Sequence, residues 1–389
     1  MADATTEVPS PTPRNNILQP LKDETRAALL GESTRPPATT MARLYPKTKN
    51  AAATLLRLPL LIILVLYAGP PGADTLASAI RQAAPHLSQH VVEIDILRDS
   101  HRHDMHNDDL FTQLLVAARE GRILAILGGP NCRTWSKLLS RKRHDGHFHG
   151  PLRGREPWAL WGLHTNEEHH QRKCDDDNIL LLRQLLLIYE AFEHGVSYLL
   201  EHPADPGPPH PSWWISDQCS SLLRLVGGRL HTFDACRLGQ ITAKATTVAT
   251  NLEDLHWLHD LRCKCRYPHY SRDDYEGMAR WPWQLMLGIA TALSTALALD
   301  PRIRAKPGPQ RPLPTARNTE DEGDDHHQQG RRWREVALAP TDHQSQPVKQ
   351  HHGCSRMSEY KPRARAQFLD TVLCQSTLQF CPQNKRQHA

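Results

Sequence analysis

Apolar and polar positions alternate in blocks through the middle of the chain, and the blocks have the lengths of strands and helices. Largely apolar segments, typical of buried strands, occur at 60–68, 90–97, 123–129 and 196–203. Segments with apolar residues at helical spacing lie between or after them, at 74–85, 108–121, 178–195 and 220–228. Two further strand candidates and a closing helix follow, at 229–239, 246–252 and 281–299.

This alternation predicts an α/β fold, a Rossmann-like, mostly parallel sheet joined by right-handed crossovers, with helices on both faces. The apolar run at 60–68 is too short to span a bilayer, which takes about 20 residues, so it predicts a buried strand and no membrane contact. Residues 1–54 and 303–389 are rich in proline and polar residues without periodicity. They predict a disordered leader and a disordered tail around one domain at 55–302.

Composition agrees with a core diluted by such flanks: only 39% of residues are hydrophobic, and there are 30 prolines and 24 histidines. The net charge of +5 permits a polyanionic partner, although an ordinary basic surface explains it better. Nine cysteines without a regular framework fit a reducing compartment. We therefore expect an intracellular protein, nuclear or cytoplasmic, and not a secreted one.

Unusual residues follow the first two strands, at the sheet edge where α/β proteins bind ligands. The first strand ends in Tyr67, Ala68 and Gly69, with Gly72 soon after, and glycines there let a ligand approach the backbone. The second strand carries Glu93, a carboxylate placed to bond the hydroxyls of a ribose. A plain tight turn and a solvated carboxylate are the alternatives.

The third and fourth strands end in residues suited to catalysis. Gly129 and Pro130 precede Cys132, which begins a helix-like segment whose free N–H groups would lower the thiol pKa. A small buried cysteine is the alternative. Glu201 directly follows an apolar run, which suits it to sharing a proton, although a cap or salt bridge explains it equally well.

In this order the segments resemble the DNA cytosine-5 methyltransferases, which are class I S-adenosylmethionine-dependent enzymes, over about residues 60–300. VLYAGPPG is similar to the first motif of that family, and GGPNCRTWS to the signature around its catalytic cysteine. The sequence EHP stands where the family has Glu-Asn-Val, and WPWQLMLGIATAL resembles the closing motif.

The resemblance implies an enzyme that binds S-adenosylmethionine and acts on nucleic acid, with DNA favoured over RNA but RNA left open. By this analogy Cys132 adds to carbon 6 of a flipped-out cytosine, Glu201 bonds N3, and Arg237 contacts the base. The implied cofactor-binding residues are Tyr67, Ala68, Gly69, Gly72, Glu93, Asp104, Gly129 and Pro130. The implied nucleic-acid contacts are Arg141, Lys142, Arg143 and Lys244.

Asn131 and His202-Pro203 depart from the family pattern, so two alternative functions stay open. One is a degenerate methyltransferase-like module, derived from a mobile element, that binds nucleic acid or protein. Another is a methyltransferase of the same fold with a different substrate. We expect no bound metal. A weaker interpretation of the segment HWLHDLRCKCRYPH is a zinc site made by His259, Cys263, Cys265 and His269.

Overall fold

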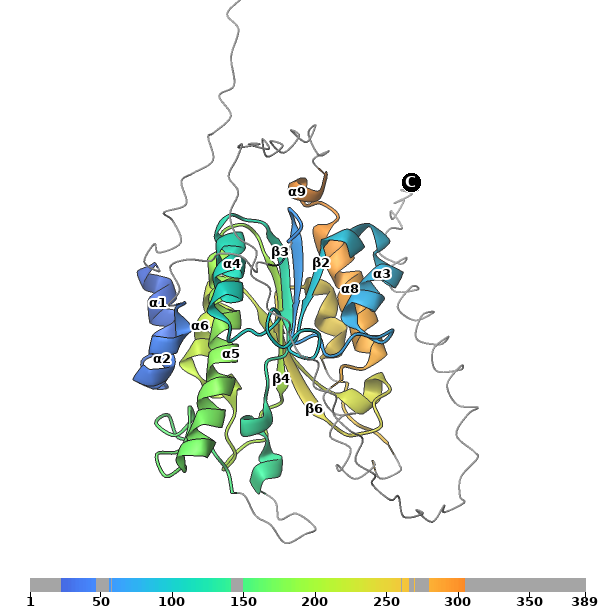
Figure 1. Cartoon of the computed structure of the whole chain (residues 1–389). Helices are drawn as coiled ribbons and strands as arrows, with labels where there is room; N and C mark the ends of the chain where they lie inside the picture. The colour runs from blue at the N-terminus through green and yellow to red at the C-terminus, as the bar shows by residue number, and fades with distance from the viewer. Residues whose placement is uncertain are drawn as a thin grey trace, which may run out of the picture. The chain divides into compact units, whose positions relative to one another are not determined.

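A computed structural model describes residues 22–46, 56, 58–140, 150–259, 261–265, 269 and 280–304. The strands form one six-stranded sheet in the order β2-β1-β3-β4-β6-β5 (Figure 1). Their bounds are Ile62–Leu66 (β1), Val91–Ile94 (β2), Ile123–Gly128 (β3), Ser197–Pro203 (β4), Arg229–Asp234 (β5) and Ala245–Thr250 (β6). Strands β1 to β4 pair in parallel, whereas β6 is antiparallel to both of its neighbours. The link from β5 to β6 is too short for a crossover, so β6 must reverse direction.

Helices cover both faces of the sheet, as predicted (Figure 1). Helices α4 (Asp108–Arg119), α5 (Glu168–Phe192) and α6 (Asp217–Val226) pack on one face. Helices α3 (Leu76–Ala83) and α8 (Trp283–Leu297) pack on the other. Along β1, the side chain of Leu64 packs in the core on the α5 face of the sheet, and those of Ile63 and Val65 pack in the core on the α8 face. Burial on both faces explains why this strand is apolar at every position.

Shorter helices connect these elements. They are η2 (Pro85–His90), η3 (Arg133–Trp135), η4 (Lys137–Ser140), η5 (Trp213–Ile215), η6 (Ala235–Leu238), η7 (Glu253–Leu258) and α9 (Pro301–Arg304).

The first strand, β1, lies between β2 and β3, so the chain first builds the sheet outward on one side and then on the other. In such sheets a crevice forms at the carboxyl ends of the two strands where the order reverses. Close packing holds these strands together, because a Cβ on Gly128 would stand 2.8 Å from the carbonyl oxygen of Leu66. The predicted site residues that follow β1 and β3 therefore share one edge.

The prediction of a disordered leader over 1–54 is wrong for residues 22–46. These form α1 (Asp23–Leu30) and α2 (Ala38–Leu44), which contact α5 and α6. Leu29 and Leu44 are fully buried in the core, and Asp217 accepts hydrogen bonds from the backbone of residues 32–34 at 2.6–2.8 Å. Each helix buries only two residues, too few to produce a visible period in the sequence.

Helix α5 begins at Glu168 rather than at Asn178, where the apolar pattern starts. Its first turns are mostly polar, but Cys174, Asp177 and Asn178 are buried among other polar groups. Polar burial of this kind is invisible to a hydrophobic pattern.

Contacts divide the chain into two units, Met1–Lys306 and Pro307–Ala389, and the second lies outside the described residues. Within the described ranges, none of the helices has both the length and the apolar character needed to span a membrane.

Candidate active site at the carboxyl edge of the sheet

A buried ion pair stands beside the third strand. Lys244, just before β6, donates from Nζ to Oε1 of Glu201 on β4 at 3.0 Å. Trp281 donates from Nε1 to Oε2 of the same carboxylate at 3.4 Å. A Cβ on Gly129 would stand 2.5 Å from that Oε2, so the carboxylate lies directly over this glycine. Burial alone would lower the pKa of Lys244, but the charges of Glu201 and Cys132 outweigh it and raise the pKa.

The thiol of Cys132 lies within the electrostatic reach of this pair. The residue is partly buried and leads from the Gly129-Pro130 turn into η3. Burial raises its pKa to about 11; the Lys244 charge opposes that rise, while the Glu201 carboxylate adds to it. The charges of Glu201 and Lys244 therefore both act on the Cys132 thiol.

The predicted lowering of the Cys132 pKa is wrong. Helix η3 spans only three residues, so it offers little of the dipole that a full α-helix presents at its N-terminus. Removal of the thiol from water is the larger effect, and it favours the neutral form.

A buried polar network, which the sequence did not reveal, holds the segment that follows Cys132. Asp177 of α5 accepts hydrogen bonds from the Thr134 backbone N–H at 3.2 Å and hydroxyl at 2.6 Å. Arg153 donates to the Thr134 hydroxyl at 2.8 Å and to Asn178 at 2.7 Å. Its guanidinium stands 4.0 Å from the centre of the Trp135 ring. Arg153 and Asp177 lie in a polar insertion, where a buried arginine has no sequence signature.

His202, the neighbour of Glu201, points to the opposite face of the sheet because side chains alternate along a strand. Its ring lies 5.6 Å from that of Trp135, 6.3 Å from Trp213 and 6.2 Å from Trp214. Burial lowers its pKa to about 3, so it is neutral, and its Nε2 has no hydrogen-bond partner among the described residues. Trp213 is fully buried and is therefore a core residue.

The turn after β1 is tied to the end of β2. Asp95 accepts a hydrogen bond from the Gly69 N–H at 2.8 Å, and Arg98 donates to the Gly69 carbonyl at 2.9 Å. Arg98 also donates to Oε1 of Glu93 at 2.9 Å. One oxygen of the predicted ribose-binding carboxylate is thus already paired, while Oε2 receives no hydrogen bond within the described part of the chain.

Space remains on the same turn. A Cβ at Gly69 or Gly72 would meet no atom within 4 Å, and Gly69 has a φ of 75° that favours glycine. Tyr67 has a φ of 57° and donates to the carbonyl of Leu180 at 2.8 Å, and the Asp104 charge contributes to the rise in its pKa, which burial dominates. The predicted cofactor residues Tyr67, Gly69 and Gly72 therefore share one turn, to which Glu93 is tied through Arg98.

Arg237 and residues 141–143 are predicted to contact nucleic acid. Arg237 lies exposed on η6, and the Glu201 carboxylate takes its side-chain bonds from Lys244 and Trp281 instead. Lys244, predicted to contact nucleic acid, is thus the cation paired with Glu201, and the base contact of Arg237 stays a prediction. The predicted phosphate contacts Arg141, Lys142 and Arg143 lie outside the described residues.

The weaker metal prediction is corrected in one ligand. Cys263, Cys265 and His269 converge with Cys236 of η6, which the sequence reading did not include. His259 lies elsewhere, with its ring 6.4 Å from that of His231.

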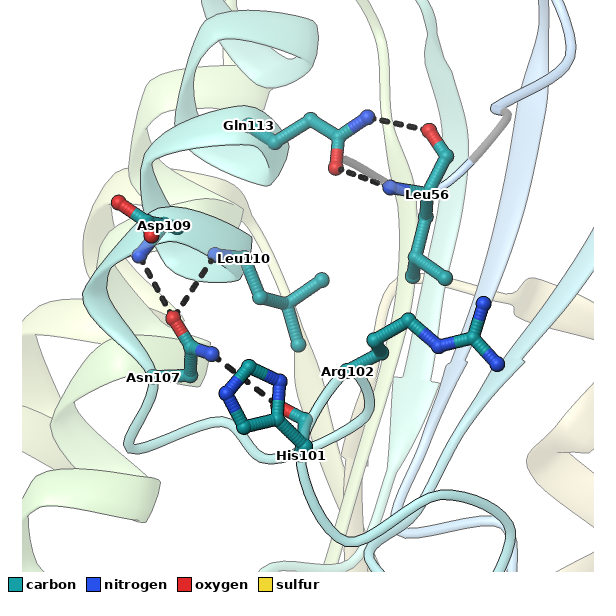
Figure 2. Close-up of a pocket in the computed structure, with 7 residues that line it drawn as sticks. All are labelled: Leu56, His101, Arg102, Asn107, Asp109, Leu110 and Gln113. Atoms are coloured by element: carbon teal, nitrogen blue, oxygen red, sulfur yellow. Dashed lines mark hydrogen bonds between the residues drawn. The ribbon is translucent and has the colours of Figure 1, made fainter. Parts of the chain in front are cut away.

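A separate hollow beside α4 holds about 30 Å³, room for one or two water molecules (Figure 2). Asn107 caps α4 by accepting from the backbone of Asp109 and Leu110 at 2.8 and 3.4 Å, and Gln113 bonds the backbone of Leu56 (Figure 2). Asn107 and Gln113 thus serve the local fold.

No protein-family model, curated protein or solved structure that was compared with this chain matches it. The geometry of the Cys132 site therefore carries the functional argument.

Proposed function

We propose that this protein transfers a methyl group from S-adenosylmethionine to carbon 5 of cytosine in nucleic acid, with DNA favoured over RNA, through a covalent adduct with Cys132. One observation supports this most strongly. A cysteine thiol, a carboxylate and an ammonium group meet at the carboxyl edge of the sheet, beside an open glycine turn on β1.

The proposed chemistry begins with the weakness of cytosine carbon 5 as a nucleophile. The Cys132 thiol would lose its proton to solvent, its electron pair would form a bond to carbon 6, and the electron pair of the 5,6 double bond would move to carbon 5. Negative charge would spread to N3, where Glu201, having taken a proton from solvent, would donate it. Carbon 5 would take the methyl group as the sulfonium becomes a neutral thioether; loss of the carbon 5 proton to solvent would then restore the 5,6 double bond, release the Cys132 thiolate and return the N3 proton to Glu201.

Glu201 and Cys132 are electrostatically linked in a way that suits this chemistry. The Glu201 charge raises the pKa of the Cys132 thiol, and Lys244 lowers it. Any group that offsets the Glu201 charge, such as the paired Lys244 ammonium, therefore favours the thiolate of Cys132.

The β1 turn fits the cofactor. Gly69 and Gly72 leave open space above the backbone, and Oε2 of Glu93 is the acceptor for ribose hydroxyls. Tyr67 and Asp104 stand next to this turn. When bound there, S-adenosylmethionine would supply a methyl group activated by a sulfonium.

A second candidate is a methyltransferase-like module that binds nucleic acid or protein without catalysis. It is favoured by Arg98, which bonds both Gly69 and Glu93 and so occupies part of the cofactor turn. The two candidates differ in whether a cofactor displaces this arginine.

Covalent trapping tests the proposal. In 5-fluorocytosine the fluorine replaces the hydrogen on carbon 5, so elimination fails and the adduct persists. The full chain, mixed with duplex DNA containing this base and with S-adenosylmethionine, should give a denaturation-resistant complex that Cys132→Ser abolishes. Cys219→Ala, a change at a buried cysteine of α6, is the control that should retain it.

The other outcomes separate the candidates. Cofactor binding without trapping on DNA or RNA would refute the cytosine mechanism while leaving a methyltransferase with another substrate. Absence of cofactor binding by calorimetry would favour the non-catalytic module. Trapping on RNA but not DNA would overturn the preference for DNA alone.

A further inference from the structure

We infer that Cys236, Cys263, Cys265 and His269 form a structural zinc site that fastens the segment after η7 to the end of β5. This inference is independent of the proposed methyl transfer. It rests on the geometry of the four side chains, on the backbone that presents them and on the chemistry of the donor set.

The four ligand atoms are already close to the spacing that zinc imposes. They all lie within 4.8 Å of one another, with 3.1 Å between Cys263 Sγ and His269 Nε2 and 4.0 Å between Cys265 Sγ and Cys236 Sγ. Zinc–sulfur bonds of about 2.3 Å at tetrahedral angles place ligand atoms about 3.7 Å apart. To bind the ion, the longest of these distances would shorten by about 1 Å and the Cys263–His269 distance would lengthen by a few tenths of an ångström.

Hydrogen bonds with Asp234 position the segment that carries Cys263. Asp234, at the end of β5, donates its N–H to the carbonyl of Leu261 at 2.9 Å. Its carboxylate accepts the N–H of Cys263 at 2.7 Å. Cys236 follows two residues later on η6, so one strand end supplies one ligand and orients the loop that carries the others. Supporting hydrogen bonds of this kind are typical of built metal sites.

The donor set selects the metal class and its role. Three thiolates and an imidazole are the soft ligands that favour zinc over magnesium or calcium. Four protein ligands complete a tetrahedron and leave no open position for water or substrate, so the role is structural rather than catalytic. A disulfide between Cys236 and Cys265 is the competing use of these residues, and it would remove two of the ligands.

The backbone next to Cys236 is hydrogen-bonded to Lys244, the residue that pairs with Glu201. The N–H of Ala235, next to Cys236, donates to the carbonyl of Lys244 at 2.9 Å. A metal on η6 would therefore stiffen the backbone that carries the Lys244 ammonium. If the proposed function holds, loss of zinc should weaken trapping without preventing cofactor binding.

Metal content of the full chain tests the site. After purification under reducing conditions and dialysis against buffer with a slight excess of zinc, then against metal-free buffer, mass spectrometry should find one more zinc per chain in the wild type than in Cys236→Ser or Cys265→Ser. Affinity should fall more than 100-fold, since loss of supporting contacts alone costs about 10–100-fold. The difference decides, because the 24 histidines of the chain can hold zinc weakly elsewhere.

Matched controls use residues outside the cluster. His259→Ala and Cys132→Ser should keep the wild-type zinc, and cobalt in place of zinc should show the charge-transfer and visible bands of tetrahedral thiolate coordination. Cys265 is exposed, so its replacement should leave the circular dichroism unchanged. Equal zinc in the wild type and Cys265→Ser would overturn the site, as would a Cys236–Cys265 disulfide in protein purified under reducing conditions.

Discussion

The ionisation of Cys132 gives the sharpest quantitative prediction. Its pKa of about 11 lies two units above the ordinary value of 9.0, and this difference corresponds to about 2.7 kcal/mol against the thiolate. At pH 8 the thiolate fraction should be about 0.1%, against about 10% for an unperturbed thiol. Alkylation of Cys132 should therefore rise about tenfold per pH unit up to about pH 10, with no plateau near pH 9.

Two substitutions should move this profile in opposite directions. Glu201→Gln removes a charge that raises the pKa, so the inflection should move down by about 1–3 units, while Lys244→Met should move it further up. Glu190→Gln is the matched control. It alters the ion pair between Glu190 of α5 and Arg119 of α4, and it should leave the profile unchanged.

The assay is alkylation of the full chain by iodoacetamide between about pH 7 and pH 10, read by peptide mass spectrometry on the fragment that contains Cys132. Below the inflection the rate relative to the wild type reports the thiolate fraction, so at a given pH Glu201→Gln should react faster and Lys244→Met more slowly. A wild-type plateau at or below pH 9, or equal rates in Glu201→Gln and the wild type over this range, would refute the electrostatic account.

Three further predictions concern the fold around the site. The folded pKa of His202 is about 3 against 6.5 in the unfolded chain, so the unfolded state binds the proton first and stability falls as pH drops below about 6.5. Between pH 7.5 and pH 5, urea unfolding should lose about 2 kcal/mol more in the wild type than in His202→Phe; parallel losses would contradict this. Gly129→Ala should displace the Glu201 carboxylate and abolish trapping with unchanged circular dichroism, and full trapping would argue against the contact. Asp217→Ala should cost about 1–3 kcal/mol and speed tryptic cleavage within residues 22–46, whereas unchanged cleavage would show that the helices do not depend on this carboxylate.

Most of the fold could be predicted because burial leaves a local trace. A strand buried on both faces, such as β1, is apolar at every position, and a helix such as α4 repeats its apolar residues every three or four positions. The strands predicted at 123–129 and 196–203 match β3 and β4 to within a residue. Helices α1 and α2 were missed because each buries too few residues to leave that trace.

Within the candidate site, the sequence indicated where reactive residues gather, since Cys132 comes four residues after the end of β3 and Glu201 lies near the end of β4. The groups that join them from distant parts of the chain depend on the tertiary structure. Lys244 reaches Glu201 because β6 runs antiparallel to β4, and Cys236 rather than His259 joins Cys263, Cys265 and His269 because η6 follows β5. Burial likewise set the ionisation of the thiol against the direction that its place in the sequence indicated. Contacts and desolvation depend on distances in space, and residues far apart in a sequence carry no local pattern that records them.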